Sequence, residues 1–393
     1  MATATTTPTS TIQDDLLERL AQRAAGYDRE NHFFDEDFAD IKNTDYLKMA
    51  IPEEFGGKGF TAAEVARETQ HLAERAPADA LALNMHIYWM GVAADMRRMG
   101  DSSLDWMLRE GAEGEIFAAG HGETGNDLPL FLSTARAEPV DGGYRFYGRK
   151  MFGSLTPVWT RLGVHGMDTT DPEAPKVVHA FMPRDTEGYE IKETWDTLGM
   201  RATRSDDTIL NGAFVPDRYI ARILPAGTPD LFILCIFARA EIGFGAVYLG
   251  IARRALQLAV ETAHKRTSVA LTRSMAYNPE VQHLVASMRM DVEITTALLD
   301  RVAADWSEGV DYGNDWPLKL VTAKHVAVEA AKRVVDGAMA ISGGAGMFRP
   351  NELERLYRDV RCGGFHPANT LLAHEIVGKI ALGIDLGEQP RWG

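Results

Sequence analysis

The chain has 393 residues, 45% of them hydrophobic, and a formal net charge of −15. Nucleic acids and anionic membranes attract clustered Lys and Arg, so this charge argues against both as main partners, and no apolar run reaches the roughly 20 residues of a membrane-spanning helix. The two cysteines, Cys235 and Cys362, have neither the spacing of a metal site nor the number of a disulfide framework. The start of the chain lacks the basic and apolar regions of a signal peptide, so we predict a cytoplasmic protein that binds no metal.

Residues 1–113 are predicted to form a helical domain. Apolar residues recur at helical spacing in four segments: Asp14–Ala25, Asp37–Met49, Thr61–Leu72 and Asp79–Met99. The glycine-rich turn at residues 51–59 follows no predicted strand, and we interpret it as a connector rather than as a phosphate-binding loop.

Residues 114–226 are predicted to form a β domain. Short runs such as Tyr144–Tyr147 and Val177–Met182 show the period-two pattern of strands. The sequence Asp141-Gly142-Gly143 lies between two such runs and predicts a hairpin turn.

Residues 227–393 are predicted to form a helix bundle. Three long helical segments are followed by two shorter ones: Phe232–Arg266, Glu280–Gly309, Leu318–Ile341, Glu352–Asp359 and Asn369–Leu386. Helices of this length in succession favour an antiparallel bundle.

This order of helices, strands and helices carries six motifs: Ile51-Pro-Glu-Glu-Phe-Gly-Gly; Lys150-Met-Phe-Gly-Ser154; Leu198-Gly-Met-Arg-Ala-Thr with Phe214-Val-Pro216; Arg266 at the end of a helix; Ser342-Gly-Gly-Ala-Gly; and Tyr357-Arg-Asp. Together they resemble the acyl-CoA dehydrogenase superfamily of flavoproteins over nearly the whole chain. The resemblance implies an α+β fold with an N-terminal helical domain, a middle β-barrel domain and a C-terminal four-helix bundle.

The resemblance also implies bound FAD, whose ring needs hydrogen bonds at its N5 atom and its pyrimidine edge. Ser154 is expected to donate a hydrogen bond to N5, and Phe152 to pack beside the ring. The loop with His121, Glu123 and Asn126 is expected to serve the pyrophosphate, although it is one residue shorter than the family's loop and lacks its proline.

The remaining cofactor contacts are expected from a neighbouring subunit, because the family pairs its bundles into dimers and tetramers. The resemblance places Arg266 and Ser268 at the pyrophosphate, and Gly343 and Gly344 where the dinucleotide approaches the backbone. We therefore predict a homodimer or a homotetramer.

For the reaction, the resemblance implies α,β-dehydrogenation of an acyl thioester by a carboxylate base. The position of the family's usual glutamate is Pro367, with His366 beside it. Other members carry the base on the first bundle helix, where the matching position is Ala240. Glu241 is its neighbour, and one helical step turns a side chain by about 100°, so Glu241 serves only if the local register differs. The structural alternative for Glu241 is an ion pair with Arg239 or Arg253.

A second branch of the superfamily, the reduced-flavin monooxygenases, needs no such base. The chain resembles this branch at His366 and at His86, with Ser154 serving the flavin edge. The structural alternative for His86 is a helix residue packed among apolar neighbours. Because most chains of this overall pattern are dehydrogenases, dehydrogenation is our first prediction and monooxygenation is a close alternative. A flavin-binding homologue without catalysis is the third alternative.

Partners follow from the same resemblance. Apolar residues near His86–Met90, Leu128–Leu132 and Phe237 predict a small hydrophobic substrate, either an acyl thioester or an aromatic compound. The electron partner is either an acceptor flavoprotein or a flavin reductase.

Overall fold

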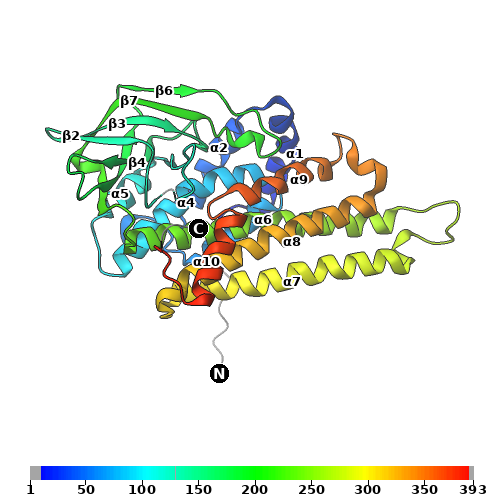
Figure 1. Ribbon diagram of the computed structural model, residues 1–393. Coiled ribbons are helices and arrows are strands. Elements are labelled where there is room, and N and C mark those ends of the chain that lie inside the picture. The colour runs from blue at the N-terminus through cyan, green and yellow to red at the C-terminus, as the bar shows by residue number, and fades with distance from the viewer. Residues whose placement is uncertain (1–9, 129, 389–393) are drawn as a thin grey trace.

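The computed structural model describes residues 10–128 and 130–388, so the predictions about the start of the chain and about Pro129 fall outside the described residues (Figure 1). The first part of the chain is helical, with α1 (Asp14–Glu30), α2 (Asp35–Lys42), α3 (Ala62–Ala73), α4 (Pro77–Arg98) and α5 (Asp105–Glu113). Local signals set these bounds: Thr61 and Glu64 form a capping box at the start of α3, and Pro77 occupies the first turn of α4.

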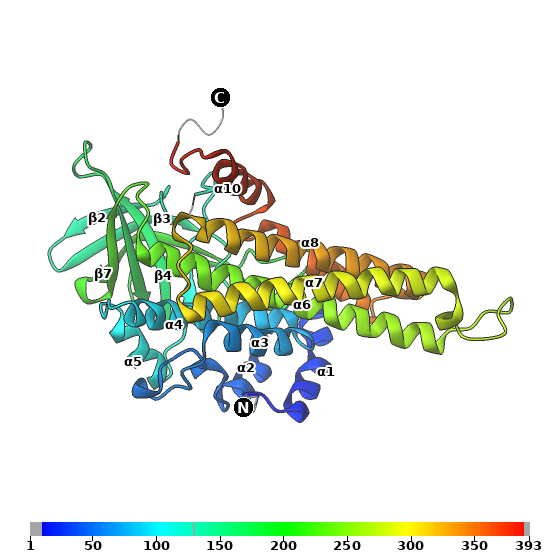
Figure 2. The same cartoon turned by 90° about the horizontal axis from the view of Figure 1, so that it is seen from below.

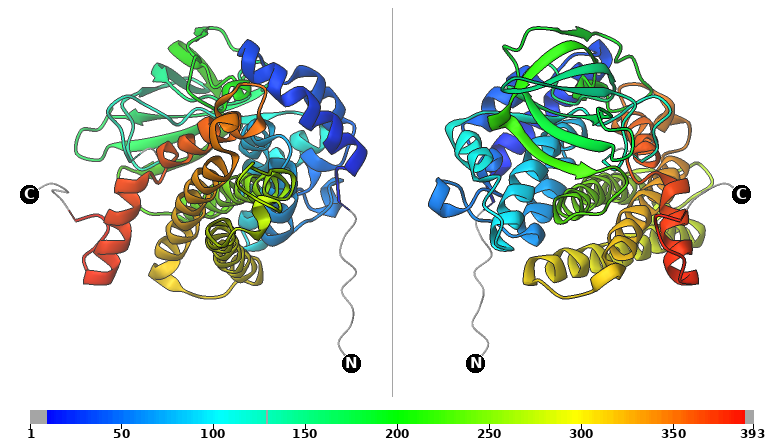
Figure 3. Two further views of the ribbon diagram at one scale, coloured as in Figure 1. Left: turned by 90° about the vertical axis from the view of Figure 1, so that its right-hand side faces the viewer. Right: turned by 60° about the vertical axis from the view of Figure 1, so that its left-hand side comes forward.

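Eight strands form one curved sheet that lies to one side of the helices (Figure 3). They are β1 (Phe117–Ala119), β2 (Arg136–Val140), β3 (Gly143–Lys150), β4 (Arg161–Asp168), β5 (Lys176–Pro183), β6 (Tyr189–Lys192), β7 (Asp207–Pro216) and β8 (Ile220–Pro225). The order is β6-β7-β3-β2-β4-β5-β8, with β1 parallel to β4. The predicted hairpin is confirmed, because β2 and β3 pair antiparallel and Gly142 takes the left-handed conformation with φ 77°.

Three long helices form the C-terminal bundle and extend away from the sheet (Figure 2). They are α6 (Leu231–Lys265), α7 (Pro279–Glu308) and α8 (Trp316–Ser342), followed by the shorter α9 (Glu352–Arg361) and α10 (Thr370–Leu382). By length and composition α6 could span a membrane, contrary to our reading of the sequence, but 78% of its most apolar window is buried inside the protein. Burial of that kind is typical of a core helix. The predicted limit after residue 113 falls between α5, which ends at Glu113, and β1, and the limit after residue 226 falls between β8, which ends at Pro225, and α6, which begins at Leu231.

A buried ion pair joins the N-terminal helices to the bundle. Asp95 on α4 accepts two hydrogen bonds from the guanidinium of Arg239 on α6, at 2.6 and 2.9 Å, and a third from Trp306 Nε1 on α7 at 2.7 Å. All three residues are at most 7% exposed. A buried guanidinium without its carboxylate is strongly unfavourable, so Asp95 holds three helices in register.

We expect Asp95→Ala to lower the free energy of unfolding by about 3–5 kcal/mol, because it leaves the buried charge of Arg239 without a partner. Urea denaturation of both proteins measures this difference. The matched control is Asp15→Ala, which removes an exposed ion pair with Arg19 and is expected to cost at most about 0.5 kcal/mol. Equal losses in the two variants would contradict the role given to Asp95.

Candidate functional site

The segment after β3 is a strained turn that presents an aromatic ring to solvent. Phe152 and Leu155 both have positive φ, 59° and 68°, which is uncommon for residues with side chains. Phe152 is 57% exposed, and its ring lies 6.0 Å from that of Trp195, between centroids, in a T-shaped arrangement. A strained backbone that exposes a large apolar ring favours ligand binding at this point, which fits a flavin.

Ser154 lies in the same turn and begins a row of buried hydroxyl groups. Its Oγ is 2.7 Å from Oγ of Ser205, which is in turn 2.7 Å from Oγ1 of Thr203. Thr203 donates to the main-chain oxygen of Met200 at 2.8 Å. Sequence reasoning selected Ser154 and missed the two hydroxyls behind it.

The loop expected at the pyrophosphate is held together by its own polar side chains. Glu123 is buried and accepts a hydrogen bond from Lys150 Nζ. Burial acts to raise the pKa of Glu123, but the charge and the hydrogen bond of Lys150 act against it, and the pKa is lowered. Asn126 donates to Glu123 at 2.8 Å and accepts from the N–H of Leu128 at 3.0 Å. Glu123 and Asn126 therefore shape the loop, and its exposed turn is left to the main-chain N–H groups.

His121 stands at the start of this loop beside two further imidazoles. Its ring centroid is 5.2 Å from that of His165 and 5.6 Å from that of Trp89, and His165 is stacked on His179. Burial lowers the pKa of all three histidines. The group is therefore neutral at physiological pH and adds no positive charge for a phosphate.

The structure does not support His86 as a catalytic residue. The side chain is fully buried, with Nε2 3.0 Å from the main-chain oxygen of Leu47 and Nδ1 accepting from the N–H of Phe117 at 3.1 Å. Both ring nitrogens are engaged by the backbone, and burial lowers the pKa to about 4. His86 has the structural role that its apolar neighbours allowed.

Two buried charges clamp the turn that follows α9. Glu241 on α6 accepts from the N–H of Ala368 at 2.9 Å. Lys324 on α8 donates to the main-chain oxygens of His366 and Ala368, at 3.0 and 2.8 Å. Neither predicted ion pair of Glu241 forms, since Arg239 binds Asp95 and Arg253 lies by Glu74. The carboxylate of Glu241 instead reaches the turn where the resemblance expects the catalytic base.

Glu241 is only partly satisfied in this position. The residue is 2% exposed, and its Oε2 has no hydrogen-bond partner among the described residues. Burial raises its pKa to about 8, and the charge of Lys324 opposes this shift. The group is thus poised between the protonated and the ionised form near neutral pH.

His366 is held as a neutral ring beside the clamp. It stacks on Phe244 with ring centroids 4.5 Å apart, and its Nε2 is 2.8 Å from the hydroxyl of Tyr248. Burial lowers the pKa of His366 to about 3. The imidazole and the phenol form an uncharged hydrogen-bonding pair on the same turn.

The predicted cofactor residues of the bundle come together at its far end. Arg266 donates to the main-chain oxygens of Ile341 and Ser342, at 2.9 and 2.5 Å. Gly343 has φ 59°, and a Cβ there would lie 3.0 Å from the Arg266 guanidinium. Ser268, two residues after Arg266, and Gly344, next to Gly343, are both exposed to solvent. The 35 residues of α6 span about 50 Å at 1.5 Å per residue, and Arg266 lies at the C-terminal end of this helix.

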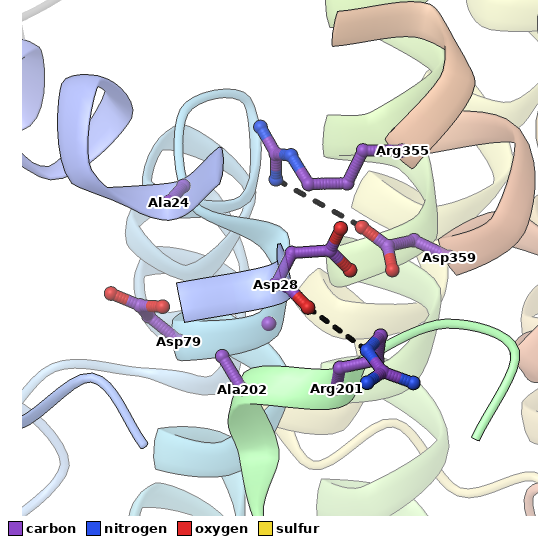
Figure 4. Close-up of a pocket in the computed structure, with 8 residues that line it drawn as sticks. Ala24, Asp28, Asp79, Arg201, Ala202, Arg355 and Asp359 are labelled. Atoms are coloured by element: carbon purple, nitrogen blue, oxygen red, sulfur yellow. Dashed lines mark hydrogen bonds and ion pairs between the residues drawn. The ribbon is translucent and has the colours of Figure 1, made fainter. Parts of the chain in front are cut away.

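A cavity of about 10 Å³ lies where α1, α4 and α9 meet the loop before β7 (Figure 4). It has room for about one water molecule and none for a flavin. Asp359 lines it and accepts from the N–H of Met200 at 2.6 Å, and burial raises the pKa of Asp359 to about 6. The cavity is lined by Ala24, Asp28, Ala78, Asp79, Arg201, Ala202, Arg355 and Asp359.

Lys324 and Tyr248 belong to the candidate site and were missed in the sequence. Lys324 offered a signal, because it lies three residues after Val321 and three before Ala327 on the apolar stripe of its helix, where a charge needs a partner. Tyr248 offered none, since an aromatic residue in an apolar helix is ordinary.

Family models agree with this architecture. One, described as acyl-CoA dehydrogenase, C-terminal domain, matches residues 242–370, and another, described as acyl-CoA dehydrogenase, N-terminal domain, matches residues 9–101. The relative DnmZ of Streptomyces peucetius, an amino sugar nitrososynthase, is 30% identical over 94% of this chain and 92% of its own. The fold is thus that of a family whose members are flavin-dependent oxidoreductases. The chain belongs to the acyl-CoA dehydrogenase family.

Other relatives divide between two chemistries. Benzylmalonyl-CoA dehydrogenase of Aromatoleum aromaticum is 26% identical and covers 88% of this chain and 89% of its own. Dibenzothiophene monooxygenase of Rhodococcus erythropolis is 26% identical, with 93% and 91% covered. The crystal structure of a nitrososynthase from Micromonospora carbonacea is 25% identical, with a TM-score of 0.83 and 94% and 95% covered. A structure of KijD3 with FMN and an amino-sugar nucleotide, at 22% identity and TM-score 0.85 with 98% of both chains covered, shares the fold.

We expect Lys324→Met to lower the free energy of unfolding by about 2–4 kcal/mol. Methionine has about the length of lysine but no charge, so two main-chain oxygens and Glu241 lose their charged partner. Hydrogen exchange should also become faster at residues 365–372. The control is Lys332→Met on the same helix, which removes a surface pair with Glu329 and should change stability by less than about 0.5 kcal/mol. Unchanged exchange at the turn in Lys324→Met would refute the clamp.

Proposed function

We propose that this protein is a monooxygenase that uses reduced flavin and O2 to transfer one oxygen atom to a small hydrophobic substrate. The observation that carries the proposal is the turn after α9. The position of the usual proton-abstracting glutamate is Pro367, and Glu241, whose carboxyl group reaches the turn, accepts a hydrogen bond from the N–H of Ala368 there. The turn therefore offers a neutral hydrogen-bonding pair in place of a free carboxylate.

The residues of the turn suit this chemistry. Bound reduced flavin supplies the electrons, so that one atom of O2 enters the substrate and the other leaves as water. His366 and Tyr248 can relay a proton and stay neutral, because the pair releases one proton as it takes up another, and burial disfavours the charged imidazole. Lys324 and Glu241 fix the main chain of the turn and thereby the position of the His366 ring.

FAD is the flavin that we propose for this chain, and a second copy of the chain completes its site. Phe152 and Ser154 lie in the turn after β3, whereas Arg266 lies at the end of α6 and Gly343 follows α8. We infer that one cofactor contacts the two sets across a subunit boundary, as the resemblance to the family implies. Several large apolar side chains are exposed on the segments around α9 and α10, which agrees with a surface covered by a second subunit: Met347, Phe348, Leu371 and Leu382.

A second candidate, dehydrogenation of an acyl thioester, rests on one observation. Oε2 of Glu241 has no partner among the described residues, and the pKa of the carboxyl group is raised to about 8. An ionised Glu241 would be a strong base beside the turn. An acceptor flavoprotein would then take the electrons, whereas the monooxygenase requires a flavin reductase.

Two mixing experiments separate the candidates. Protein loaded with oxidised FAD is mixed under anaerobic conditions with acyl-CoA thioesters of graded chain length, and we expect its visible absorbance to persist. Protein loaded with photoreduced FAD is then mixed with ¹⁸O2 and a set of thioethers, phenols and hydrophobic amines. We expect one ¹⁸O atom in a product, found by mass spectrometry. The opposite result is loss of the visible absorbance of FAD on addition of an acyl-CoA. If that loss is absent in Glu241→Gln while FAD remains bound, the reaction is dehydrogenation.

For the half-site at the far end of the bundle, we expect Arg266→Ala to reduce the FAD that remains bound after gel filtration by about tenfold, which is the loss of about 1.4 kcal/mol from one charged contact. Arg273→Ala is the control, because this arginine lies in the same loop but stacks on Tyr277. Light scattering should give a dimer or larger assembly for both variants. Full retention of FAD in Arg266→Ala would remove this residue from the site.

A further inference from the structure

Three hydroxyl groups and one main-chain oxygen form a closed row behind the strained turn. Ser154, Ser205 and Thr203 are 7%, 3% and 0% exposed. The three contacts in the row are Ser154 Oγ to Ser205 Oγ at 2.7 Å, Ser205 Oγ to Thr203 Oγ1 at 2.7 Å, and Thr203 Oγ1 to the oxygen of Met200 at 2.8 Å. These are ordinary hydrogen-bond lengths, so each contact contains a proton.

Counting the protons fixes the direction of every bond. Three contacts need three protons, and the three hydroxyls carry one each, while the main-chain oxygen of Met200 carries none. Thr203 must therefore donate to Met200, Ser205 to Thr203, and Ser154 to Ser205. The single proton of Ser154 points inward, and only lone pairs of its oxygen are left for a ligand on the other side.

The opposite direction is disfavoured by the same contacts. If Ser154 gave its proton to a ligand, two protons would remain for three contacts, and at one of them two oxygens would face each other at 2.7 or 2.8 Å with no proton between them. Burial keeps solvent water from filling that gap. The main chain of Met200 is held in place, because its N–H donates to Asp359 at 2.6 Å and its oxygen accepts from Trp195 Nε1 at 3.1 Å.

We propose that Ser154 accepts a hydrogen bond from the flavin and donates none, so that the site binds reduced flavin more tightly than oxidised flavin. The reduced ring carries a hydrogen on N5, whereas N5 of the oxidised ring is itself an acceptor. This differs from the expectation, drawn from the family resemblance, that Ser154 donates to N5. Ser205 and Thr203 are positioning residues that act through Ser154. The inference rests on the proposed function only in placing the flavin edge at Ser154.

The test is the midpoint potential of bound FAD, measured by spectroelectrochemistry and checked by separate titrations with oxidised and photoreduced FAD. In Thr203→Val, Ser205 no longer has an acceptor there and turns its proton to Ser154, which releases its own proton toward the flavin. Ser205→Ala has the same result one step nearer. In both variants we expect the ratio of oxidised to reduced affinity to rise about tenfold, which lowers the potential by about 30 mV for this two-electron couple.

Thr156→Val is the matched control. Thr156 is buried in the same turn, but its proton goes to the main-chain oxygen of Gly153, outside the row. Its potential should equal that of the unmodified protein, and circular dichroism melting shows whether each variant is folded. A folded Ser205→Ala keeps the test decisive if Thr203→Val does not fold.

The outcomes separate the row from the flavin site itself. If Ser154→Ala shifts the potential while Thr203→Val and Ser205→Ala do not, the row has no fixed direction and the inference is overturned, with the flavin still placed at Ser154. If even Ser154→Ala leaves the potential and both affinities unchanged, the inference fails together with that placement. The supporting result is a lower midpoint potential of bound FAD in Thr203→Val and in Ser205→Ala, with no change in Thr156→Val.

Discussion

A charge that is buried must meet a partner, and this constraint organises the molecule around α6. The helix runs through the centre of the fold, yet it carries Arg239 and Glu241 on faces that solvent does not reach. Arg239 pairs with Asp95 from the N-terminal helices. Glu241 accepts a hydrogen bond from the N–H of Ala368 in the turn between α9 and α10. Because an unpartnered charge costs several kcal/mol, these two contacts fix what lies on opposite sides of α6.

The candidate site inherits its geometry from this arrangement. Lys324 on α8 approaches the same turn as Glu241, so two helices of the bundle set the position of His366. On the other side, Asp359 on α9 holds the peptide of Met200, which ends the row of hydroxyls that begins at Ser154. The turn and the flavin edge are therefore both positioned from α9 and its continuation.

The sequence was sufficient for the fold and for residues that act near their own segment. Hydrophobic periods and six motifs in order predicted the three parts of the chain. The resemblance named Arg266 and Gly343 as separate cofactor residues, and the structure brings them together, since a Cβ at Gly343 would lie 3.0 Å from the Arg266 guanidinium. Contacts across long separations were out of reach. The direction of the Glu241 side chain was predicted from its own helix alone, whereas its partner, the N–H of Ala368, lies 127 residues later. His86 was ambiguous because nothing in its own helix shows that Leu47 and Phe117 engage both ring nitrogens.

The clamp on the turn also bears on how such a site can be redesigned or can diverge. A loop transplanted from a dehydrogenase would arrive beneath Lys324 and Glu241, whose buried charges match the main-chain groups of the present turn. A new loop with other main-chain positions would leave both charges stranded, so exchange of the loop alone is penalised before any chemistry is gained. Segments of α6, α8 and the turn have to change as one unit, which couples three distant stretches of the gene into a single evolutionary step.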